Sequence, residues 1–261
     1  MNRKRFYYLV KLQFLGFRYS GWQKQPDRKT IEGMLTKTLK FILADTNFKI
    51  LGAGRTDAKV SALDAAFELF IEDKPLQDLV LFKEIFNKNL PSDIKILSIN
   101  EVNESFNIIH SSKKKKYVYL FSFGKKNHPF CAPYMTNVLD QLDIALMQEG
   151  AQLLTGTHNF RSFTARPREN TKVRRTIISA KIEENTMLRA NFFPEKSYAF
   201  IVEGTGFMRY QIRMMMGALI QLGKRELSLT TIQTSLKEDS DIKFTYVAPG
   251  SGLHLHSLEF E

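Results

Sequence analysis

The stretch FKILGAGRTDAKVSALDAAFELFIE, residues 48–72, joins two apolar runs through a loop that holds two glycines and a charged triplet. The first four and the last eight residues are candidate strands, and the second run alternates apolar positions as a half-buried strand does. Glycines permit positive φ and close backbone approach, so a tight turn between the strands is predicted. Such a turn accounts for the glycines and for Asp57 as a cap of the local backbone. It does not account for Arg55, two residues earlier.

The sequence around this hairpin predicts an α+β unit. Strand patterns occupy 6–14 and 93–99, and helical spacing of apolar residues occupies 31–43 and 76–88, the first helix with Thr30 as its N-cap. With the two central strands, the order becomes β-α-β-β-α-β, which is the split ferredoxin-like arrangement.

The second half of the chain roughly repeats this order. Residues 116–123 alternate aromatic side chains as in a strand, and residues 207–223 form a long apolar helix that ends at a glycine. The other expected elements are helices at 140–154 and 229–237 and strands at 174–183, 187–193, 197–203 and in the C-terminal GLHLHSLEF. We therefore expect two ferredoxin-like halves, 1–108 and 109–261, whose antiparallel sheets join around a central cleft.

The charge of the chain indicates an acidic partner. Lysine and arginine number 38 against 27 acidic residues, a net charge of +11, and the basic residues gather at 113–116, 125–126 and 166–175. Any one run is compatible with a solvated face, but three such runs favour a surface that follows phosphates, with nucleic acid ahead of an anionic membrane.

Cysteine and histidine usage argues against disulfides and metal sites. The one cysteine, Cys131, excludes an internal disulfide and a cysteine-based metal site, which fits a reducing cytoplasm. His254 and His256 alternate along one strand face without an apparent third ligand, so we interpret them as ordinary edge-strand residues. No apolar segment approaches the roughly 20 residues of a membrane-spanning helix, and we expect no membrane association.

The loop GRTDAKVSA resembles the signature Gly-Arg-Thr-Asp-x-Gly-Val-His-Ala of the TruA family of tRNA pseudouridine synthases. Counterparts of further family motifs follow in order along almost the whole chain: FLGFRYSGWQKQ at 14–25, NKNLPSDI at 87–94, KKYVY at 115–119, GTHNFRSF at 156–163, FMRYQIRMMMGALIQLG at 207–223 and PGSGLHL at 249–255. Each motif alone is modest, and the ordered set is specific.

The resemblance implies an isomerase that uses neither a cofactor nor a metal. A uridine is flipped out of the RNA, its N1–C1′ bond is broken, and the base is rotated and rejoined through C5. By position, Asp57 is the essential carboxylate, with either sugar or base as its covalent target. Tyr117 stacks on the uracil and assists proton removal from C5, although its alternating strand pattern by itself favours core packing. Arg213 pairs with Asp57 and holds it ionised.

The remaining positions carried over from the resemblance are contacts to RNA. Arg55 touches the RNA backbone or helps to splay the nucleotide, and Leu253 lines the pocket wall. Further candidate contacts are Gln23, Lys59, Lys172, Arg174, Arg175 and Arg209. The family binds tRNA across two subunits, so a cytoplasmic homodimer acting on the anticodon stem-loop of tRNA is expected.

Several positions depart from the family pattern. Lys59 replaces a glycine, Ser61 replaces the common histidine, and Leu15 replaces an early aspartate, while Ile108 and Ile109 stand where Ala-Arg is usual. If residue 59 has positive φ, a lysine there adds strain of about 1 kcal/mol. These departures keep open a diverged paralogue that modifies other uridines and a non-catalytic RNA-binding protein of the same fold. A hydrolytic nucleoside enzyme is weaker, because no paired-carboxylate or metal motif supports it.

Overall fold

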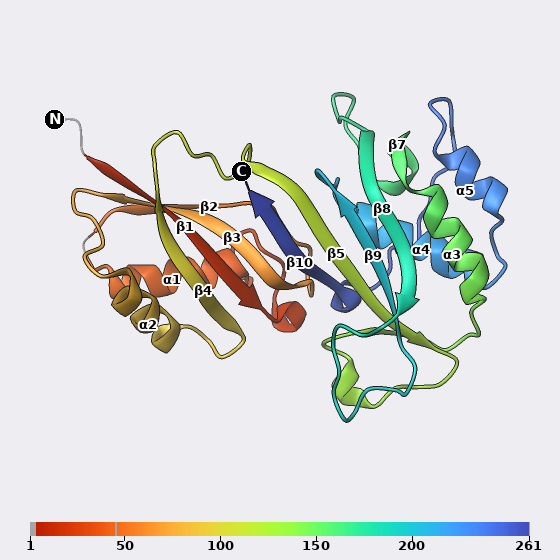
Figure 1. The fold of residues 1–261 in the computed structure, drawn as a ribbon, viewed down its shortest axis with the longest axis horizontal. Helices are drawn as coiled ribbons and strands as arrows, with labels where there is room; N and C mark the ends of the chain where they lie inside the picture. The colour runs from red at the N-terminus through yellow and green to blue at the C-terminus, as the bar shows by residue number, and fades with distance from the viewer. Residues whose placement is uncertain (1–3, 45, 261) are drawn as a thin grey trace. The chain divides into compact units, whose positions relative to one another are not determined.

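The computed structural model describes residues 4–44 and 46–260 and divides into two compact units (Figure 1). The first unit runs to Lys113 and includes the C-terminal strand from Leu255, and the second runs from Lys114 to His254. The predicted halves, 1–108 and 109–261, differ from these units in placing the C-terminal strand with the second half. Each unit contains a sheet and helices, so the predicted α+β class is confirmed.

The first unit has the predicted β-α-β-β-α-β order. Its elements are β1 (Arg5–Phe14), the short helix η1 (Gly16–Arg18), α1 (Ile31–Ile42), β2 (Phe48–Gly52), β3 (Ser61–Glu72), α2 (Leu79–Asn89) and β4 (Ile94–Val102). The strands β4, β1 and β3 are antiparallel neighbours, β2 pairs with β3, and β10 (Leu253–Phe260) also lies beside β3.

Sequence pattern explains why these segments fold as they do. Alternate residues of β1 are buried: Tyr8, Val10, Leu12 and Phe14. The Thr30 hydroxyl accepts a hydrogen bond from the Gly33 amide, which confirms the predicted N-cap of α1. Both helices lie on the same side of the sheet (Figure 1), so the opposite face of the unit is left to strands and loops.

The second unit is built around a sheet with the strand order β5-β9-β8-β7. Its antiparallel strands are β5 (Ser112–Phe123), β7 (Gly156–Asn159), β8 (Arg174–Glu184) and β9 (Tyr198–Gly204), and the short β6 (Thr136–Val138) pairs with β5 in parallel. The helices are α3 (Ile144–Leu153), α4 (Gln211–Gly223) and α5 (Leu229–Ser235), with the short helices η2 (Pro129–Cys131), η3 (Arg161–Phe163) and η4 (Gly250–Gly252).

Two predictions for this unit are wrong. The segment 187–193 is a loop and not a strand, because the Asn185 side chain accepts from the Met187 and Leu188 amides and donates to the Leu188 carbonyl, replacing ladder hydrogen bonds. The long helix begins at Gln211, since Tyr210 has φ 63°, in the left-handed region. The strands β6 and β7, at three and four residues, are too short for an alternating pattern to indicate.

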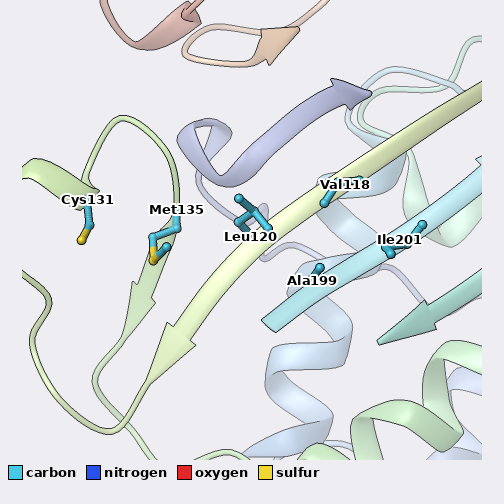
Figure 2. Packing of buried hydrophobic residues seen from close by; sticks show 6 residues of the cluster. All are labelled: Val118, Leu120, Cys131, Met135, Ala199 and Ile201. Carbon is cyan, nitrogen blue, oxygen red and sulfur yellow. The ribbon is translucent and has the colours of Figure 1, made fainter. Parts of the chain in front are cut away.

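The loop that replaces the expected strand still contributes to the core. Its apolar residues Met187, Leu188, Phe192 and Phe193 pack against a buried cluster from β5, β9, η2 and the residue just before β6. Figure 2 shows the members of this cluster: Val118, Leu120, Cys131, Met135, Ala199 and Ile201. Apolar residues therefore alternate here without forming a strand.

Candidate active site

Asp57 lies half-buried in the loop between β2 and β3, on a backbone braced by the segment that follows β1. The Trp22 amide donates to the Thr56 carbonyl at 3.0 Å, and the Lys59 amide donates to the Tyr19 carbonyl at 3.0 Å. The brace holds the residues on both sides of Asp57, so the loop can present the carboxylate in a fixed position.

Glycines make this close approach possible. Gly21 has φ +93°, and a Cβ there would lie 2.6 Å from the Thr56 carbonyl oxygen. A Cβ on Gly16 would lie 1.8 Å from the Val60 carbonyl oxygen, while the Gly16 amide donates to the buried Ser61 hydroxyl at 2.9 Å. The segment 14–25 thus packs closely against the Asp57 loop and supports it.

A second motif holds the brace itself. The Tyr19 hydroxyl donates to Asp93 Oδ1 at 2.7 Å, Arg18 donates to both carboxylate oxygens of Asp93, and the Leu15 amide donates to the Asp93 carbonyl at 2.9 Å. Burial, followed by the hydrogen bond to Asp93, raises the pKa of Tyr19 to about 12. Sequence reasoning missed Asp93 as a supporting residue, although it lies within the NKNLPSDI motif at 87–94.

The other candidates in this loop are exposed. Lys59 has φ 66°, so the condition under which strain was predicted is met, and its Nζ lies 5.5 Å from the centroid of the Phe17 ring. Arg55 and Gln23 are also exposed. These three polar side chains have the access to solvent that contact with a large ligand requires.

In the second unit, Tyr117 lies half-buried on β5 opposite Val202. Its ring meets the Phe207 ring edge-on at a centroid distance of 5.3 Å and an interplanar angle of 85°. The core position that the alternating pattern favoured for Tyr117 is instead occupied by Tyr119. The Tyr119 side chain is fully buried, its hydroxyl donates to the Pro249 carbonyl at 2.8 Å, and burial raises its pKa. One aromatic strand thus contains a core tyrosine and a partly accessible one.

Arg213 lies half-buried in the first turn of α4. Its Nε donates to the Ala248 carbonyl at 2.7 Å, and the Ala248 amide donates back to the Arg213 carbonyl at 3.1 Å. Its guanidinium carbon lies 5.1 Å from the centroid of the Tyr210 ring, and that of the exposed Arg209 lies 4.9 Å from the same ring. Tyr210 therefore contacts both cations at the start of the helix.

Leu253 is buried at the start of β10. The chain just before it presses on β5, where a Cβ on Gly252 would lie 2.8 Å from the Leu120 carbonyl oxygen and 2.8 Å from the Tyr119 ring. The PGSGLHL motif thus packs directly against the aromatic strand, and the pocket-wall role of Leu253 stays a prediction.

The lysine run at 113–116 is only partly solvated. Lys114 and Lys116 form ion pairs with Glu203 at 3.1 Å and 3.6 Å, and burial lowers the pKa of Lys115. The run is partly neutralised within the protein, which weakens it as a continuous phosphate contact.

The predicted basic run at 166–175 leads into β8, and its side chains point to both faces of that strand. Arg174 is exposed and pairs with Glu238 at 2.7 Å, whereas Arg175 points to the opposite face of the strand and is half-buried. Lys172, just before the strand, is exposed. Lys172 and Arg174 therefore share exposure to solvent, and Arg175 does not belong with them.

The described residues contain no cluster of three or more histidine, cysteine or acidic side chains able to hold a metal ion. His254 is buried, its Nε2 lies 2.7 Å from the Tyr134 carbonyl oxygen, and burial lowers its pKa. Within residues 4–44 and 46–260, no helix has the length and apolarity that crossing a membrane requires.

Comparison with known proteins confirms the resemblance. Residues 151–261 match the family model for tRNA pseudouridine synthase. The tRNA pseudouridine synthase A of Thermodesulfovibrio yellowstonii is 32% identical over 255 residues, covering 95% of this chain and 97% of that protein. The enzymes of the same name from Dictyoglomus thermophilum and Streptococcus thermophilus are 30% and 32% identical over 252 and 257 residues, covering 96% and 97% of this chain and 98% and 99% of those proteins. The chain therefore belongs to the tRNA pseudouridine synthase family and is an RNA pseudouridine synthase.

Proposed function

We propose that this enzyme isomerises a uridine in the anticodon stem-loop of tRNA, with Asp57 as its essential carboxylate. The observation that carries the proposal is the brace around Asp57, where hydrogen bonds and two obligatory glycines hold the loop on both sides of the carboxylate. Preorganised charge stabilises a transition state without reorganisation at the moment of reaction. A carboxylate that must act on a flipped nucleotide benefits from this fixed position.

The reaction balances within the substrate. The N1–C1′ bond breaks, the detached uracil turns, and a C5–C1′ bond forms; the proton lost from C5 is matched by one gained at N1. Asp57 stabilises or traps the species formed on cleavage, on either the sugar or the base. The reaction consumes no water, oxidant or reductant.

Tyr117 and Arg213 are the proposed partners of Asp57. Tyr117 stacks on the flipped uracil and assists removal of the C5 proton, which its half-buried ring and edge contact with Phe207 support. Arg213 pairs with Asp57 and keeps it ionised. The Nε–Ala248 hydrogen bond supports this role, because it restricts the guanidinium.

We further propose that the enzyme is a cytoplasmic homodimer and that the RNA lies in the central cleft around which the sheets of the two halves of the chain join. Leu253 lines the pocket, and the exposed Arg55, Lys59, Gln23 and Arg209 contact the RNA. Lys172 and Arg174 add phosphate contacts, and Arg175 has a smaller part because it is half-buried. These residues are spread over several loops, which suits a folded RNA better than a short oligonucleotide.

The test compares Asp57→Asn with wild type by pseudouridine mapping of total RNA from cells that lack the gene. We expect wild type to restore pseudouridine in the tRNA anticodon stem-loop, and Asp57→Asn to restore none while still binding tRNA. Asp64→Asn is the matched control, because Asp64 is a half-buried carboxylate of the adjoining strand paired with Lys11 at 3.0 Å.

Three outcomes would redirect the proposal. Restored sites in other RNA positions indicate the diverged paralogue. Binding without any pseudouridine from wild type indicates the non-catalytic RNA-binding protein. Full activity of Asp57→Asn removes Asp57 from the mechanism.

A further inference from the structure

Five aromatic side chains of the second unit meet on a partly exposed surface outside the candidate active site. They come from the η2 region and from the loop after β8, and we call them the aromatic surface: His128, Phe130, Tyr134, Phe192 and Phe193. Ring centroids are 5.0 Å apart for His128 and Phe130, 5.9 Å for Phe130 and Phe192, and 5.4 Å for Phe192 and Phe193. Phe130 is nevertheless 66% exposed.

This exposure is an unexpected feature of the fold. Burying a phenylalanine contributes favourably to stability, and a ring that stays in water beside other rings marks an interaction surface. His128 and Phe192 both approach Phe130 edge-on, at interplanar angles of 76° and 86°. These edge contacts restrict the Phe130 ring and leave most of it exposed to solvent.

The loops that carry the aromatic surface are fixed by the core beneath them. Phe192 and Phe193 pack on the buried cluster drawn in Figure 2. The Cys131 thiol lies 3.1 Å from the Phe192 carbonyl oxygen and links the two loops. Because this order exists before any ligand arrives, binding there requires little additional loss of entropy.

The charges in the same loops are mainly positive. Residues 124–134 contribute Lys125 and Lys126, and residues 185–196 contribute Arg189 and Lys196 against one acid, Glu195. All five side chains are exposed. Aromatic rings on loops that also carry exposed cations are a combination that binds single-stranded nucleic acid, since bases stack on rings and phosphates approach cations.

We propose that the aromatic surface is a second RNA contact, at which an unpaired base of the substrate stacks on Phe130. The proposal rests on the RNA substrate of the proposed function but concerns a different surface. A second copy of the chain is a poorer occupant, because a two-fold contact would place the same four cations against themselves. An RNA brings the opposite charge and a planar partner.

The test measures dissociation constants of an unmodified tRNA transcript and of a blunt-ended RNA duplex for Phe130→Ala, Phe130→Trp and wild type. Each change is made in the Asp57→Asn background so that no turnover intervenes. We expect Phe130→Ala to weaken tRNA binding about tenfold, as loss of one stacked base does, and to leave duplex binding unchanged. Phe130→Trp should restore tRNA binding.

Phe41→Ala is the control, because it removes the same ring from a 75% exposed position on α1. Equal loss on both RNAs, or no loss on tRNA, would overturn the proposal. So would a fall in molar mass by light scattering for Phe130→Ala, which would show that a second copy covers the surface. Failure of the proposed function looks different: wild type then makes no pseudouridine, whatever the binding data.

Discussion

The hydrogen bond between Tyr19 and Asp93 helps to hold the brace behind the Asp57 loop, and its contribution can be measured. Tyr19 is 3% exposed, the side chain of Asp93 is 13% exposed, and their bond is 2.7 Å long. Replacing Asp93 by alanine leaves the buried Tyr19 hydroxyl without its acceptor, which costs about 1–3 kcal/mol of unfolding free energy. Tyr19→Phe removes the donor instead, and the carboxylate keeps its contact with Arg18.

The double variant should be less destabilised than the sum of the two single variants. With both partners gone, no unpaired hydroxyl is left in the interior, so we expect a coupling free energy of about 1 kcal/mol or more. Urea denaturation at neutral pH measures all four proteins. Asp93→Asn should fall between alanine and wild type, because the amide oxygen still accepts from Tyr19.

The same proteins report on the pH dependence of stability. The pKa of Tyr19 is about 12 in the folded chain and about 10 when unfolded, so the unfolded state loses its proton first. The shifted pKa of Tyr19 therefore contributes its full stability to the folded state below pH 10, and this contribution is lost as pH rises toward 12. Tyr19→Phe should therefore lose less stability than wild type across that window.

The kcat and KM of the Tyr19 and Asp93 variants test whether the brace positions Asp57. The Tyr19 carbonyl accepts from the Lys59 amide, so displacement of Tyr19 should misplace Asp57 and lower kcat more than it raises KM. Additive single effects, within about 0.3 kcal/mol, would refute the coupling. Unchanged kcat in a destabilised Asp93→Ala protein would refute the link to the loop.

Two further predictions concern residues near this frame. Residue 59 has φ 66°, so the unfolding free energy of Lys59→Gly should be about 0.5–1 kcal/mol higher than that of Lys59→Ala. Both variants lose the charge, and only glycine adopts the left-handed backbone freely. Equal stabilities in urea denaturation would contradict this. The Glu68 carboxyl of β3 is buried, and burial raises its pKa, so its contribution is present below the unfolded pKa and is lost as pH rises through the folded one. Glu68→Gln should therefore gain stability relative to wild type as pH rises above the pKa of an unfolded glutamate, about 4.3, and parallel stability curves would argue against a raised pKa of Glu68.

Local sequence patterns were sufficient for most of the elements. The β-α-β-β-α-β order of the first unit follows from apolar periods of two and of about four residues, and Thr30 marks the start of α1 as an N-cap. The same reasoning fails at 187–193, where apolar alternation serves loop packing. It also predicts too early a start for α4, because no local sequence pattern indicates the left-handed backbone of Tyr210.

The family, the charge and Asp57 as the leading catalytic candidate follow from the linear chain alone, because ordered motifs and composition are properties of the amino-acid order. The contacts that hold the Asp57 loop arise only on folding: Gly16, Tyr19 and Gly21 approach it from an earlier stretch of the chain, and Asp93 supports them in turn. Tertiary packing also gives similar residues different surroundings: on β5, Tyr119 is fully buried and Tyr117 is only half-buried. The physical reason is that burial and hydrogen-bond partners come from contacts between segments far apart along the chain, and no local period encodes such contacts.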